Sequence, residues 1–221
     1  MRFRLLTALP FLLLSATAAH AQVDEQWCRN GLFPSEPPFA LGRIGGTGKA
    51  FFNNDMDGCP WQGTACTARS YVVPGDVVII NRTLNGYACA FYPSKGGGTA
   101  GWIESKRIEL MPNDTNPPMA SWLGNWSSAD NPTLTITSEV GTLNVSGEAY
   151  WPGREPSPDY PSIHIGEIAG AITRSGNRAR YSDGEGCTVD FTLLGEFLIA
   201  GDNLGCGGMN VSFSAVYRRA P

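Results

Sequence analysis

The chain has 221 residues, of which 42% are hydrophobic and 16% are charged, and its formal net charge is −4. This composition is typical of a globular protein and excludes the disordered and fibrous classes. The excess of acidic side chains argues against nucleic acid as a partner, because its phosphates are bound by lysine and arginine.

The first 21 residues have the features of a secretory signal peptide. Arg2 and Arg4 precede an apolar run over 5–15, and Ala19-His20-Ala21 offers a small-x-small cleavage site before Gln22. Without this segment the chain keeps all six cysteines, but of its two histidines only His164 stays. A single histidine excludes a multi-histidine metal site. We expect export to the periplasm or the medium, no membrane anchor and no cofactor.

Short segments of alternating apolar residues recur along the chain, and glycine or proline turns separate them. This pattern predicts an all-β fold, because no stretch after residue 21 repeats apolar residues at a helical period. In the first half the expected strands are 48–53, 70–73, 76–83, 86–92 and 99–104. In the second half they are 133–137, 142–149, 163–172, 178–182, 187–194, 197–202 and 210–218.

A segment with three prolines, 111–119, interrupts the pattern of strands. It predicts a semi-rigid linker over 113–121, between a domain at 22–112 and an acidic domain at 122–221. The fold class expected is therefore two small antiparallel β-barrel domains joined by a Pro-rich linker. Residues 113–221 carry twelve acidic and six basic side chains, whereas 22–112 are balanced.

The six cysteines are divided by the same boundary and are expected to form disulfides in an exported protein. Cys187 and Cys206 follow the linker, and we expect them to pair with each other. The four earlier cysteines allow three pairings, of which we favour Cys28–Cys59 with Cys66–Cys89.

Several features of the first half occur together: the turn Gly75-Asp76 before the apolar run 77–80, the aromatic segment 87–92, and Gly101-Trp102-Ile103. In this combination the segment ending at 108–110 resembles the bacterial Src-homology-three-like barrel. The run 77–80 also predicts a fully buried strand, and Trp102 a core residue. The resemblance implies either binding of cell-wall peptide or glycan, or a scaffold without a ligand.

The second half opens on Trp122-Leu-Gly-Asn-Trp126 and closes on a Cys-Gly-Gly-x-Asn-Val-x-Phe-x-x-x-Tyr segment at 206–217. It looks like the β domain at the C-terminus of many exported bacterial proteins, some of them related to periplasmic lysozyme inhibitors. The alternation of Val211, Phe213 and Tyr217 predicts one buried face, and we expect the closing strand to pair with the opening one.

Within this half, Ser146-Gly147-Glu148-Ala149-Tyr150 matches the Ser-Gly-x-x-Tyr pattern of some of these inhibitors. In that family a loop with such residues enters the enzyme cleft and hydrogen-bonds the catalytic carboxylates. The resemblance thus implies binding roles for Ser146, Gly147 and Tyr150. The same residues also fit the end of a strand.

The irregular stretch 150–161 follows directly. Trp151, Arg154 and Tyr160, together with Tyr150, give it the composition of a binding loop, and its prolines limit the entropy lost on binding. An ordinary hairpin loop that packs its own aromatic side chains is the alternative interpretation.

Enzymatic interpretations have less support in the sequence. Glu148, Asp183 and Glu185 are carboxylates of the kind that glycoside hydrolysis requires in a pair, but exposed turns are commonly acidic. His164 lies between two isoleucines at strand period, so we expect it to face outward without a catalytic partner. We therefore expect no enzyme and no catalytic residue.

A calcium loop is also incomplete. Asn53, Asp55 and Asp57 have the spacing of its first ligands, but Thr64 stands where the bidentate glutamate is needed. The leading expectation is a non-catalytic binding protein whose protein partner is a basic lytic enzyme such as lysozyme. The alternatives are an adaptor that binds peptidoglycan through the first domain, and a carrier of a small apolar ligand inside the second barrel.

Overall fold

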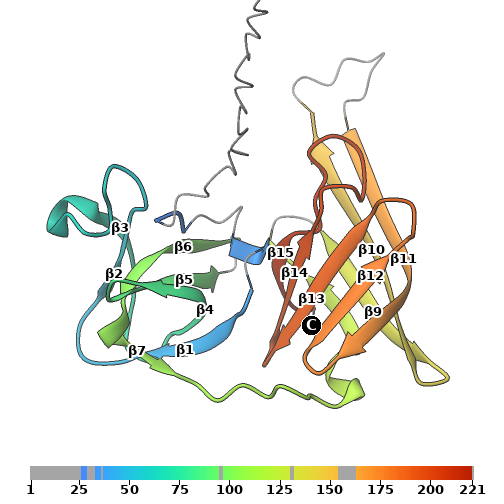
Figure 1. Ribbon diagram of the computed structural model, residues 1–221, viewed down its shortest axis with the longest axis horizontal. Coiled ribbons are helices and arrows are strands. Elements are labelled where there is room, and N and C mark those ends of the chain that lie inside the picture. The colour runs from blue at the N-terminus through green and yellow to red at the C-terminus, as the bar shows by residue number, and fades with distance from the viewer. Residues whose placement is uncertain are drawn as a thin grey trace, which may run out of the picture.

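The computed structural model describes residues 26–28, 33–35, 37–94, 97–129, 132–153 and 163–220, in which regular structure consists of strands and short 3-10 helices (Figure 1). The all-β expectation is therefore confirmed. The expected signal peptide lies outside these residues. In the described part of the chain, no helix has the length and apolar character needed to span a bilayer.

The first half forms a seven-stranded antiparallel sheet with the order β3-β2-β6-β5-β4-β1-β7. Its elements are η1 Phe33–Ser35, β1 Ala40–Ile44, β2 Ala50–Asn53, η2 Gly63–Cys66, β3 Thr67–Val72, β4 Val77–Leu84, β5 Tyr87–Ser94, β6 Gly97–Glu104, η3 Ser105–Arg107 and β7 Ile108–Leu110. The ladder ends at β3 and β7, so the barrel expected for this half is not closed by hydrogen bonds, because each of these strands pairs on one side only.

The second half is a closed barrel of eight antiparallel strands, in which each strand pairs with its neighbours in sequence and β15 pairs back with β8. Its elements are η4 Met119–Ser121, β8 Gly124–Ser127, β9 Thr133–Glu139, β10 Thr142–Pro152, β11 Ile163–Ser175, β12 Arg178–Ser182, β13 Thr188–Leu194, β14 Phe197–Asp202 and β15 Ala215–Arg219. The predicted pairing of the closing strand with the opening one is confirmed, and it removes the edges of this sheet.

Alternating residues of the barrel strands fill its interior. The inward side chains include Trp126, Phe191, Phe213 and Tyr217, each less than 2% exposed, and they pack into one continuous cluster. Trp122 joins them from the end of η4. An interior occupied by large aromatic side chains favours a packed core over a cavity for an apolar ligand.

The central strand β4 is buried on both faces, as its apolar run predicts. Val78 and Ile80 face the core of the first sheet, together with Phe52 and Ile103. Ile79 points to the opposite face and belongs to a different cluster. Strands read as continuous apolar runs when both of their faces are covered.

The cluster around Ile79 joins the first sheet to the outside of the barrel. From the first half it contains Phe33, Phe39, Leu41, Ile79 and Trp102, and from the barrel Leu194, Phe197 and Ile199; we call it the shared cluster. Figure 1 shows the same arrangement, with η1 lying between the first sheet and strands β14 and β15.

The segment between β7 and η4 has no strand and contacts both halves, since Asn113 accepts a hydrogen bond from the Leu41 amide and the Pro117 carbonyl accepts one from Arg174. The domain boundaries at 112 and 122 stay a prediction.

All six cysteines form disulfides, which fit an oxidising compartment outside the cytoplasm. The pair Cys187–Cys206 is confirmed. The favoured pairing of the other four is wrong: Cys59 bonds Cys66 around η2, and Cys28 bonds Cys89 on β5. The reason is the position of the segment before β1, of which residues 26–28, 33–35 and 37–39 are described and which we call the entry segment. The indole of Trp102 holds its start against the sheet by donating a 2.6 Å hydrogen bond to the Gln26 carbonyl.

Candidate functional site

The predicted binding residues that the structure describes all lie on β10. Ser146 and Gly147 are in the middle of this strand, and Tyr150 and Trp151 are near its end. Arg154 and Tyr160 lie outside the described residues. Strands β10 and β11 rise above the rest of the barrel in Figure 1, so their paired ends form a protruding ribbon.

Ser146 and Gly147 do not form a loop. Ser146 pairs with Thr135 on β9 and with Ala169 on β11, and Gly147 pairs with Leu134 and Ile168. A Cβ at Gly147 would lie 2.5 Å from the Leu134 side chain and 2.6 Å from the Thr133 carbonyl. The glycine of the Ser-Gly-x-x-Tyr pattern is therefore required by packing between neighbouring strands, and the expected inhibitory loop is here a continuous strand.

The outer face of the ribbon carries large apolar side chains. Tyr150 pairs with Ile165 and Pro152 with Ile163, which places these four side chains on one face. Tyr150, Ile163 and Ile165 are 48%, 56% and 60% exposed, and we call these three residues the apolar strip. Trp151, on the opposite face of the ribbon, is 47% exposed. Contiguous exposed apolar residues of this size commonly mark an interaction surface.

Two carboxylates continue the same face below the apolar strip. Glu148 and Glu167 pair directly across β10 and β11, and both are exposed. With Ser146 and Thr135 they border a shallow hollow of about 420 Å³. Like charges placed directly opposite each other weaken a sheet, so the fold gains nothing from this pair.

His164 does not face outward as expected, because the two isoleucines beside it take the outer face. The His164 side chain is half-buried and lies against the loop after β14. A Cβ added at Gly208 in this loop would be 3.0 Å from the Cβ of His164. Close approach also explains Gly166 and Gly207 in this contact, since a Cβ at Gly166 would lie 2.3 Å from the Cys206 carbonyl and one at Gly207 would lie 2.7 Å from Gly166. The loop closes this side of the barrel and is fixed by Cys187–Cys206.

Asp183 has a structural role in the turn before β13. Its carboxylate accepts hydrogen bonds from the amides of Glu185, Gly186 and Cys187 at 2.8 to 3.0 Å. These bonds, that from Glu185 foremost, hold the pKa of Asp183 below its usual value. A carboxylate fixed in this way is a poor candidate for the acid–base pair considered above.

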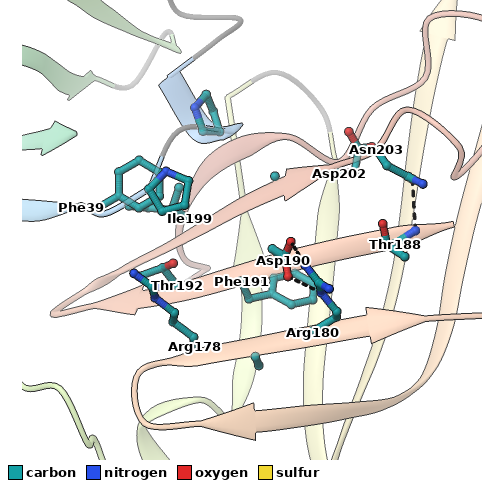
Figure 2. A pocket seen from close by; sticks show the side chains of 14 residues that line it. Phe39, Arg178, Arg180, Thr188, Asp190, Phe191, Thr192, Ile199, Asp202 and Asn203 are labelled. Atoms are coloured by element: carbon teal, nitrogen blue, oxygen red, sulfur yellow. Dashed lines mark hydrogen bonds and ion pairs between the residues drawn. The ribbon is translucent and has the colours of Figure 1, made fainter. Parts of the chain in front are cut away.

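Sequence reasoning missed a groove on the outside of the barrel, about 360 Å³ in volume (Figure 2). Its floor is formed by outward side chains of β12, β13 and β14, and one wall by Pro34, Pro37 and Phe39 of the entry segment. On the floor, Arg180 donates two hydrogen bonds of 2.6 Å to Asp190, and this pairing raises the pKa of Arg180. The alternation in 178–182 is the signal that places both arginines on the outer face, but the register with β13 is not readable from sequence.

A second groove lies on the first sheet and has a volume of about 310 Å³. Phe51, Tyr87, Lys49 and Glu104 border it. The Arg107 guanidinium, also on its border, donates hydrogen bonds to the carbonyls of residues 45, 48 and 49. Aromatic rings beside polar groups suit a ligand with a mixed apolar and polar surface.

The residues with calcium-loop spacing are used otherwise. Asp55 accepts a 2.8 Å hydrogen bond from the Cys28 amide, and Asn53 donates one of 3.2 Å to the Trp102 carbonyl. Within the described ranges no three or more histidine, cysteine, aspartate or glutamate side chains are placed to hold a metal ion together.

Comparison of the chain with protein-family models, with curated proteins and with solved structures gave no match.

Proposed function

We propose that the protein is an exported, non-catalytic binding protein that captures a protein partner on the apolar strip of the β10–β11 ribbon. A cell-wall lytic enzyme such as lysozyme, in the periplasm, is the concrete candidate. The observation that carries the proposal is the exposure of Tyr150, Ile163 and Ile165 by about half on one face of two paired strands. Aromatic and aliphatic anchors of this kind dominate the energy of protein interfaces.

Charge favours a basic partner. The Glu148–Glu167 pair adjoins the apolar strip, and the second half as a whole carries twice as many acidic as basic side chains. An acidic surface accelerates encounter with a cationic protein, and carboxylates at the rim of an apolar contact set its orientation. Binding through a strand face replaces the loop insertion that the sequence pattern implied.

The test is inhibition and direct binding of a panel of lytic enzymes by the wild-type protein and by Tyr150→Ala/Ile165→Ala. We expect stoichiometric inhibition of at least one basic member, and a loss of affinity of about 30-fold or more in the double variant. Trp61→Ala is the matched control, because Trp61 is 40% exposed in the first half and lines neither groove. Absence of binding to every member at micromolar protein, or an equal loss in the control, would refute the proposal.

A second candidate function is binding of peptidoglycan through the groove of the first sheet. It is favoured by the ring of Phe51, which is 42% exposed. This ring contacts Tyr71 edge-on, with 5.8 Å between the ring centroids, and the Lys49 ammonium lies 3.9 Å from the centroid of the Tyr71 ring. Phe51→Ala should then lower retention on insoluble peptidoglycan while leaving enzyme inhibition intact. The Tyr150→Ala/Ile165→Ala variant should show the opposite pattern.

A further inference from the structure

The groove in Figure 2 is a third candidate binding site, on strands that do not contribute to the apolar strip. Its floor has two rows of outward residues in register: Arg178 beside Thr192 and Ile199, then Arg180 beside Asp190 and Gly201. Gly201 adds no side chain to the floor, whereas Phe39 of the entry segment covers Ile199 in the shared cluster. The hollow therefore lies between the row that ends at Ile199, which Phe39 covers, and the row that ends at Gly201, which is open.

The wall of the groove is held firmly. Phe39 contacts the ring of Phe33 at 5.6 Å between centroids, and Phe33 contacts Phe91 on β5 at 5.5 Å. Cys28–Cys89 and the Trp102–Gln26 hydrogen bond fix the start of the same segment. A preformed wall lowers the entropy cost of binding a small ligand.

Within the described part of the chain, the Arg178 guanidinium borders the groove without an ionic partner. Arg180 and Asp190 neutralise each other. Asp202 lies at the border, but its carboxylate accepts hydrogen bonds from Ser212, Ser214 and the Phe213 amide. Among the described residues, no acidic side chain forms an ion pair with Arg178, which is exposed. A guanidinium in this position suits a carboxylate, which it binds through two parallel hydrogen bonds.

The floor presents side chains only. Strands β12, β13 and β14 each have a hydrogen-bonded neighbour on both sides, so their backbone groups are used within the barrel. An extended peptide normally gains its affinity from free backbone groups at a sheet edge, and none is offered here. Sugar hydroxyls, in contrast, can donate to Asp190 and accept from Arg180 without any backbone contact.

We propose that this groove binds an acidic saccharide, with the sugar carboxylate on Arg178, its hydroxyls at the Arg180–Asp190 pair and a ring face against Pro37. The site is independent of partner capture on the apolar strip, so each proposal can fail without the other. Carboxylate recognition by Arg178 is the decisive element of the proposal.

The test is calorimetric titration with trigalacturonate, with its neutral methyl ester and with a glutamate tripeptide. We expect trigalacturonate to bind at millimolar concentration or below, and both esterification and Arg178→Gln to weaken binding about tenfold or more. Arg43→Gln is the matched control, because Arg43 is an exposed arginine on β1, and it should change affinity less than about twofold. Gly201→Thr should fill the floor and abolish binding while the circular dichroism spectrum is retained.

Four outcomes would overturn the proposal. They are no binding of trigalacturonate, equal binding of acid and ester, an equal loss in Arg43→Gln, and Arg178-dependent binding of the tripeptide without binding of the saccharide. The last result would assign the groove to acidic peptides. None of these measurements involves the lytic enzymes, so they leave the proposed function untouched.

Discussion

Tyr217 is buried in the barrel interior, and its hydroxyl donates a 2.7 Å hydrogen bond to the Phe213 carbonyl. This bond ties the last strand to the irregular segment that precedes it, where Asp202 accepts from the Phe213 amide at 2.7 Å. Burial, assisted by the charge of Asp202, raises the pKa of Tyr217 well above its ordinary value. Ionisation of this phenol is therefore expected to oppose closure of the barrel at high pH.

Replacing Tyr217 with phenylalanine tests this role. Near pH 8 we expect Tyr217→Phe to lower the free energy of unfolding by about 1–2 kcal/mol, because the Phe213 carbonyl loses its donor. Burial favours the neutral phenol in the folded state, so the wild-type protein keeps this stability below a pH of about 10 and loses it as the pH rises through the raised pKa. The difference between wild type and variant in urea unfolding should therefore shrink above pH 10, and a difference that stays constant would contradict the assignment.

At the scale of elements, strand positions could be predicted from sequence because alternation is a local signal. The predicted ranges 178–182 and 197–202 coincide with β12 and β14. Strand β1 was missed because Ala40–Ile44 is short and contains Gly42, whose missing side chain admits Ile108 and Ile80. That packing is a long-range property and leaves no local pattern.

The candidate sites were less predictable for the same reason. Tyr150 and Trp151 could be selected from composition, and both are exposed. The contribution of Ile163 and Ile165 to the apolar strip depends on the register of β10 with β11, which sequence alone does not specify. Likewise, the groove forms only because the entry segment lies against the barrel. The Cys28–Cys89 bond indicates where this segment begins, but the sequence allowed three pairings of these cysteines and did not select this one.

The three disulfides should differ in their contribution to stability according to the loop that each one closes. Their sequence separations are 61 for Cys28–Cys89, 19 for Cys187–Cys206 and 7 for Cys59–Cys66. Chain entropy then predicts losses of about 4, 3 and 2 kcal/mol when each pair is replaced by alanines. Denaturant unfolding of the three double variants checks the order, and a largest loss for Cys59–Cys66 would contradict the chain-entropy account.

At the scale of the whole molecule, the shared cluster couples the first sheet to the barrel. Phe197 and Leu194 flank the β13–β14 turn, where a Cβ at Gly195 would lie 3.2 Å from Leu41 of β1. Trp102 and Ile79 approach the same cluster from the sheet, and each of these side chains is 1% exposed or less. Apolar burial of this kind contributes about 1.5–3 kcal/mol per large side chain, which favours joint rather than independent motion of the halves.

Two phenylalanines on opposite faces of the barrel wall test this coupling. Phe197 belongs to the shared cluster and Phe191 to the barrel interior, and both are 1% exposed. Each change to alanine should cost about 3–5 kcal/mol, because a cavity of similar size is left. Hydrogen exchange then separates them: Phe197→Ala should accelerate exchange at Leu41 and Ile79 in the first sheet under native conditions, whereas Phe191→Ala should act first on β12 and β13. If Phe197→Ala leaves protection in the first sheet at its wild-type level, the halves are mechanically independent, and the saccharide groove between them would then lack the fixed wall on which its affinity depends.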